Sequence, residues 1–199
     1  MTDFLLKTVR PDGAAWGGFR WTLDEGAEVI APDWDPTPVC GGGLHGLLNG
    51  AGDGSLINWS TDAVWIVAEI PDGETVVDVD GKVKVRRCIV RHVGDKTSAP
   101  EFLAAHGHTE GVVGGTATAG VGGTATAGYR GTATAGERGT ATAGCRGTAT
   151  AGDDGTIILA WWDHDLGRRR WVVGEVGIDG IVADTPYRVV DGAFVEVES

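Results

Sequence analysis

The residues of this chain that could do chemistry are histidines and carboxylates beside glycine-rich turns. His45 lies within residues 41–46, which have the G-x-G-x-x-G spacing of a dinucleotide-binding loop. Such a loop must open a helix, but residues 47–50 (Leu-Leu-Asn-Gly) follow and end any helix at once. We therefore interpret the segment as a tight turn in which backbone groups hold the His45 ring.

An alternative interpretation is that His45 lies in a small-molecule pocket. A histidine that follows Gly-Leu at a strand entry resembles the histidine that holds the nicotinamide ribose in ADP-ribosyltransferase-like folds. No tyrosine partner can be placed, and Glu69, on an expected strand, is the best available carboxylate. The resemblance implies an ADP-ribosyltransferase-like or nucleotide-binding domain with its pocket at His45 and Glu69.

Two clusters of histidine and acidic residues contain side chains that can bind a metal, but the spacing of these residues is not specific for a metal site. His106, His108 and Glu110 alternate, so on a strand they would share a face, yet they lie in a glycine-bounded junction. Asp163-His164-Asp165 precedes a turn where aspartate is expected for conformational reasons. No Ser-His-Asp or Cys-His arrangement can be assembled. We expect no catalytic residues, no metal and no cofactor.

The strongest pattern is an octapeptide, Gly-Thr-Ala-Thr-Ala-Gly plus two variable residues, that recurs five times between Gly115 and Gly152. A fixed short period predicts a repeat architecture. Thr-Ala-Thr-Ala has a strand period of two, so threonine and alanine occupy opposite faces. Eight residues are too few for a closed coil. We therefore predict a flattened β-solenoid with sixteen-residue coils of two octapeptides each.

Alanine is expected inside the coil and threonine outside. Each buried hydroxyl without a partner would cost about 1–3 kcal/mol, whereas methyl groups let the sheets approach below ~10 Å. The bracketing glycines are expected to supply the unusual backbone angles of the corners. The expected outward face consists of ten threonines: Thr116, Thr118, Thr124, Thr126, Thr132, Thr134, Thr140, Thr142, Thr148 and Thr150.

The variable residues mark the corners of the coil. A sixteen-residue coil stacks them in pairs, namely Tyr129 with Cys145, Glu137 with Asp153, and Arg130 with Arg146. A short arginine column of this kind is typical of a soluble edge that resists pairing.

These units resemble the repeats of bacterial ice-nucleation proteins, whose Gly-bracketed Thr-x-Thr strands form sixteen-residue coils. The resemblance implies outward Thr-x-Thr rows that order water and terminal arginine coils that promote assembly. That family has dozens of coils, whereas two or three rungs here give a patch ~10 Å high. We therefore expect a non-enzymatic protein whose solenoid is a rigid structural or self-association surface, with ice binding as an alternative.

The flanking regions predict an all-β chain of three parts: an N-terminal β domain (1–106), the solenoid (107–156) and an antiparallel C-terminal cap (157–199). Strands are expected at 4–9, 62–70, 75–79 and 82–86, with one solvated face at 82–86, and a helix at 100–105. The cap strands are 157–162, 170–176, 187–190 and 193–197. Type I′ turns are expected at Asp80-Gly81 and Asp191-Gly192. Residues 40–45 resemble a Cys-x-x-Gly-Leu/Ile-His motif of uncharacterised actinobacterial and phage β domains.

Charge and cysteine content limit the partners. The net charge of −12 argues against nucleic acid and anionic membranes as partners. Three irregularly spaced cysteines and the absence of an apolar leader predict a cytoplasmic protein. Arginine outnumbers lysine, which suggests an actinobacterial or phage source. The expected partner is a second copy, in a homodimer.

Overall fold

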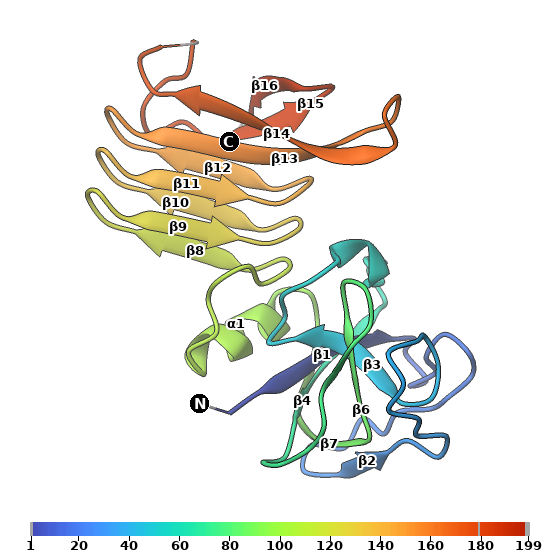
Figure 1. The fold of residues 1–199 in the computed structure, drawn as a ribbon. Helices are drawn as coiled ribbons and strands as arrows, with labels where there is room; N and C mark the ends of the chain where they lie inside the picture. Colours follow the sequence, from blue (N-terminus) through green and yellow to red (C-terminus); the bar gives the residue numbers. More distant parts are fainter. Residues whose placement is uncertain (1, 179, 198–199) are drawn as a thin grey trace. The chain divides into compact units, whose positions relative to one another are not determined.

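The computed structural model describes residues 2–178 and 180–197 (Figure 1). The chain is mostly β and forms two compact units, one up to His108 and one from Thr109 onward. The first unit is a curled antiparallel sheet, and the second is a short solenoid of parallel threonine-rich strands with antiparallel strands at its C-terminal end. The predicted all-β class is confirmed.

The sheet of the first unit has seven strands in the order β2-β7-β4-β1-β3-β6-β5. Their bounds are β1 Phe4–Val9, β2 Glu28–Ile30, β3 Leu44–Leu48, β4 Val64–Glu69, β5 Val77–Asp78, β6 Val83–Val85 and β7 Arg87–Gly94. A 3₁₀ turn, η1, spans Gly54–Leu56, and helix α1 spans Ser98–Ala105. All strands expected in this region and the helix are confirmed, while β2, β3 and β7 were not predicted.

Apolar β-branched runs form the centre of this sheet. β1 pairs along its whole length with β4, and both strands are almost fully buried. The turn at Asp80-Gly81 has positive φ at both residues, 43° and 80°, and Val79 N–H donates to Lys82 O at 2.8 Å. The predicted type I′ hairpin is confirmed.

The expected solvated face of β6 is wrong at Lys84, which is fully buried. Its ammonium group donates hydrogen bonds to Val39 O at 2.9 Å and Gly41 O at 2.8 Å. A loop more than forty residues earlier in the chain therefore covers this face and supplies acceptors for the charge. Alternation along the strand cannot reveal such a cover.

The second unit contains the five octapeptide strands and four further strands. Their bounds are β8 Thr116–Ala119, β9 Thr124–Ala127, β10 Thr132–Ala135, β11 Thr140–Ala143, β12 Thr148–Ala151, β13 Thr156–Asp163, β14 Arg168–Glu175, β15 Tyr187–Val190 and β16 Ala193–Glu196. The sheet orders are β16-β15-β12-β10-β8 and β14-β13-β11-β9. Thr132 pairs in parallel with Thr116 and with Thr148. This register confirms the sixteen-residue coil.

Alanine fills the interior of the coil, as predicted. The inward alanines of β10, β11 and β12 are at most 2% exposed, while the threonines between them are exposed or half-buried. Above Ala141 and Ala143 the next rung places Ile157 and Leu159, and Tyr187 lies opposite Ala149. Larger side chains thus close the thin core at the C-terminal end, and the predicted cap is confirmed.

The role expected for the bracketing glycines is wrong. The left-handed residue of the corners is the second variable residue, with φ of 55° at Arg130, 54° at Arg138 and 61° at Arg146. The bracketing glycines are needed because corner backbones stack closely: a Cβ at Gly144 would lie 2.7 Å from Gly128 C and Tyr129 N. Close approach, not unusual φ, selects glycine there.

Candidate functional site

The ten predicted threonines form two ladders on the two outer faces of the solenoid. One face has three rungs, from β8, β10 and β12, and the other has two, from β9 and β11. β13 continues the second ladder with Thr156, but Ile158 stands where the next outward threonine would be. Neighbouring rungs are ~4.8 Å apart, so each face is a small regular array of hydroxyl and methyl groups.

The two ends of the stack differ in chemistry. At the C-terminal end the outermost strands are β14 and β16. Arg168, Arg169 and Arg170 lie where β14 pairs with β13 beyond β11, whereas the exposed Glu175 of β14 and Glu196 of β16 place charged side chains on the two outermost strands. At the other end β8 is an edge strand of Thr-Ala-Thr-Ala with no charge, proline or bulge. Its inward Ala117 is 7% exposed, against 0% for Ala133 and Ala149 in the same sheet. The β8 end of the core is therefore the more open one.

At the end of the stack where β8 lies, the other sheet, which ends in β9, is covered by an earlier segment of the chain. Gly111 N–H donates to Thr126 O at 3.1 Å, and Gly128 N–H donates to Val112 O at 3.1 Å. The segment before the first octapeptide thus lies along β9. Within the described part of this unit, no segment pairs in this way with the outer edge of β8.

The predicted corner stacks are confirmed by backbone hydrogen bonds. Arg130 N–H donates to Cys145 O at 3.0 Å, and Arg138 N–H donates to Asp153 O at 2.7 Å. The Arg130 guanidinium also lies 5.9 Å from the centre of the Tyr129 ring. The corners are therefore rigid continuations of the coil.

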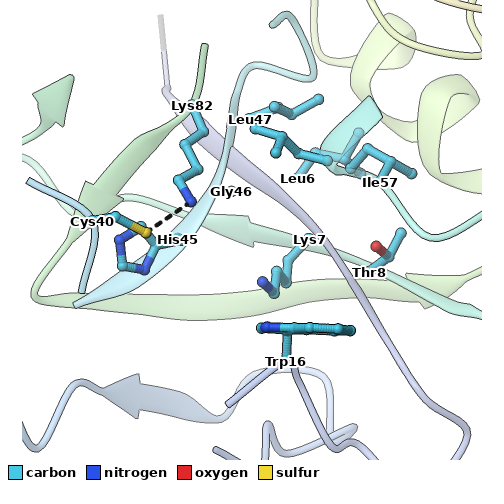
Figure 2. Close-up of a pocket in the computed structure, with 11 residues that line it drawn as sticks. Leu6, Lys7, Thr8, Trp16, Cys40, His45, Gly46, Leu47, Ile57 and Lys82 are labelled. Atoms are coloured by element: carbon cyan, nitrogen blue, oxygen red, sulfur yellow. Dashed lines mark hydrogen bonds between the residues drawn. The ribbon is translucent and has the colours of Figure 1, made fainter. Parts of the chain in front are cut away.

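His45 lies on β3 and lines a cavity of about 410 Å³ in the first unit (Figure 2). Its Nε2 accepts a hydrogen bond from Gly41 N–H at 3.4 Å, as expected for a ring held by a turn. Burial, and then the charges of Lys82, Lys7 and Lys84, lower the pKa of His45, while a hydrogen bond with the Gly43 backbone opposes this. The ring is therefore neutral at neutral pH and accepts a hydrogen bond without carrying charge.

Glu69 is not among the described residues that line this cavity. Its carboxylate forms an ion pair with Arg91, with Oε2 2.8 Å from Nε. The structure therefore does not bring His45 and Glu69 together in the cavity. The lining instead contains Cys40, which lies in the motif at residues 40–45, together with Lys7, Trp16 and Lys82. Sequence reasoning missed these last three because they come from three separate segments.

Two of the other candidate ligands, His108 and Asp163, have structural partners. His108 is buried, and its Nε2 lies 2.9 Å from Thr2 O. Asp163 accepts backbone hydrogen bonds from Asp165 and Leu166 and pairs with Arg170 at 3.1 Å. The described residues contain no group of three or more metal-ligating side chains, and none of their helices could cross a membrane.

Comparison with curated proteins finds ice nucleation proteins. The chain is 36% identical over 103 residues to ice nucleation protein InaU of Pantoea ananas, covering 51% of this chain and 10% of that protein. It is 40% identical over 102 residues to one of Pseudomonas syringae, covering 51% and 9%. It is 46% identical over 102 residues to one of Xanthomonas campestris pv. translucens, covering 51% and 6%.

The chain thus spans a tenth or less of the curated relatives it matches. The similarity is distant and partial and supports ice-nucleation-protein-like repeats. No family model matches the chain, and no solved structure matches it. The resemblance of residues 40–45 to actinobacterial and phage domains remains a prediction.

Proposed function

We propose that this chain is a non-enzymatic protein whose Thr-x-Thr solenoid is a rigid self-association surface, and that the partner is a second copy joined at β8. The observation that carries the proposal is the contrast between the two ends of the stack. At the C-terminal end both outermost strands, β14 and β16, carry an exposed glutamate, whereas β8 presents an uncharged edge without proline or bulge.

The direction of the backbone groups on β8 supports this pairing. Thr132 N–H points toward β8, since it donates to Gly115 O at 2.9 Å. Thr116 and Thr118 of β8 have the same orientation as their partners Thr132 and Thr134 in β10, so their N–H groups point away from β10. Thr116 and Thr118 offer donors along the open edge, and a strand of a second copy can accept from them.

Replacing Thr118 by proline tests the proposal. Proline removes one outward donor and is tolerated on an edge strand, so the unit should fold while association weakens. Sedimentation equilibrium over a concentration series should show reversible dimers for the original chain and a shift to monomer for Thr118→Pro.

Thr134→Pro is the matched control, because the same position in β10 donates into the ladder, and it should destabilise the unit instead. A chain that stays monomeric at every concentration, or a Thr118→Pro variant that associates as the original does, would refute the proposal.

Water ordering is the second candidate function, favoured by the regular threonine ladders and by the similarity to proteins named for ice nucleation. Pairing at β8 would lengthen the three-rung ladder, so the two functions are compatible. Thermal hysteresis and droplet-freezing measurements on the purified chain test it: faceted ice growth supports this function, and freezing like buffer alone refutes it.

A further inference from the structure

The cavity beside His45 is a concentration of positive charge in an acidic chain. The chain has four lysines and a net charge of −12. Lys7 and Lys82 line the cavity, and Lys84 lies close enough for its charge to act on His45. Among the described residues, no carboxylate forms an ion pair with any of these three lysines.

Each of the three lysines has a different environment. Lys84 is satisfied by the carbonyls of Val39 and Gly41 and so fixes the loop that carries Cys40. The Lys82 ammonium lies 3.3 Å from the Cys40 Sγ, as the dashed line in Figure 2 shows. Lys7 is half-buried on β1, and burial, followed by repulsion from Lys82, lowers its pKa. An anion between Lys7 and Lys82 would offset both the burial of the Lys7 ammonium and its repulsion from Lys82.

Apart from Thr8, the remaining walls of the cavity are apolar. They are formed by Leu6, Leu47, Leu56 and Ile57, and by the indole of Trp16. Trp16 is 97% exposed, so its aromatic face gains contact area from any planar molecule at this position. A volume of about 410 Å³ is in the range of small-molecule sites.

We propose that this cavity binds a small phosphate monoester with an aromatic group, the phosphate between Lys7 and Lys82 and the ring against Trp16. Two ammonium groups match a phosphate monoester, whose charge is about −1.5 to −2 at neutral pH, better than a carboxylate. His45 is neutral and contributes its ring edge, and Cys40 lies beside the phosphate end. This binding site is independent of the solenoid.

Calorimetry on the full chain with phenyl phosphate, inorganic phosphate and phenol tests the site. Phenyl phosphate should bind more tightly than either fragment, because only it engages both ends of the cavity. Lys7→Met and Lys82→Met should each weaken its binding about tenfold or more, the usual loss for a charged hydrogen bond. Trp16→Ala should weaken phenyl phosphate and leave inorganic phosphate unchanged.

Lys96→Met is the matched control, since it removes the same charge from an exposed position outside the cavity and should bind as the original chain does. Melting curves verify that each variant is folded. Lys82 lies at a turn, so its variant remains informative if Lys7→Met unfolds.

Alkylation of Cys40 gives a readout that does not depend on heats of binding. Cys40 is exposed, Cys88 is buried, and Cys145 belongs to the other unit and is half-buried. Bound phenyl phosphate should slow the reaction of iodoacetamide with Cys40 and leave Cys145 unchanged, as measured by peptide mass spectrometry. Absence of both binding and protection at millimolar phenyl phosphate, or equal losses in Lys96→Met and Lys82→Met, would overturn the proposal.

Discussion

Replacing Gly144 by alanine is expected to lower the free energy of unfolding of the solenoid unit by about 3 kcal/mol. The new Cβ would lie 2.7 Å from Gly128 C and Tyr129 N, which are backbone atoms of the rung below. Backbone atoms cannot rotate away as a flexible side chain can, so the two corners must separate. A melting temperature lower by roughly 10–20 °C in circular dichroism would match this loss.

Gly120→Ala is the matched control for this variant. Gly120 has the same position in the octapeptide, but a Cβ there would meet no atom within 4 Å. Its free energy of unfolding should change by less than about 0.5 kcal/mol. Equal losses in both variants would mean that glycine is needed for its conformational freedom and not for corner stacking.

Replacing Ala133 by aspartate is expected to cost about 4 kcal/mol, the usual range for a buried unpaired charge. Ala133 is fully buried in the middle of the thin core, between Ala117 and Ala149 of the neighbouring rungs. Its neighbours are methyl groups, so the carboxylate would find no hydrogen-bond donor. Urea unfolding of the full chain at neutral pH measures the loss.

Thr132→Asp places the same carboxylate on the outer face of the same strand. Thr132 is exposed, so the free energy of unfolding of this variant should lie within about 1 kcal/mol of that of the original chain. The prediction for Ala133→Asp depends on alanine lying inside. Similar stability of the two aspartate variants would contradict that arrangement.

The solenoid could be predicted from the sequence because its repeat leaves few alternatives. The period of eight residues, the Thr-Ala alternation and the cost of burying hydroxyls together define the coil, the inward alanines and the stacked corners. Local turn chemistry likewise predicted the hairpin at Asp80-Gly81, since both residues tolerate positive φ. In each case residues close in sequence determine the structure.

The cavity could not be predicted for the opposite reason. Lys7 and Lys82 come from segments far from His45 in the sequence, and only long-range strand pairing brings them to it. The alternation of residues in β6 predicts that Lys84 is solvated, because the sequence does not show the loop that covers it. The motif at residues 40–45 places Cys40 near His45, but the scarcity of lysine says nothing about where the lysines lie.

Amide hydrogen exchange of β8 at low and high protein concentration tests the central claim most directly. If a second copy pairs with this edge, exchange at Thr116 and Thr118 should be fast in dilute solution and slow markedly as concentration rises. Amides of β10, which already donate within the unit, should exchange slowly at both concentrations. Exchange at β8 that does not depend on concentration would contradict the claim that this edge joins two chains.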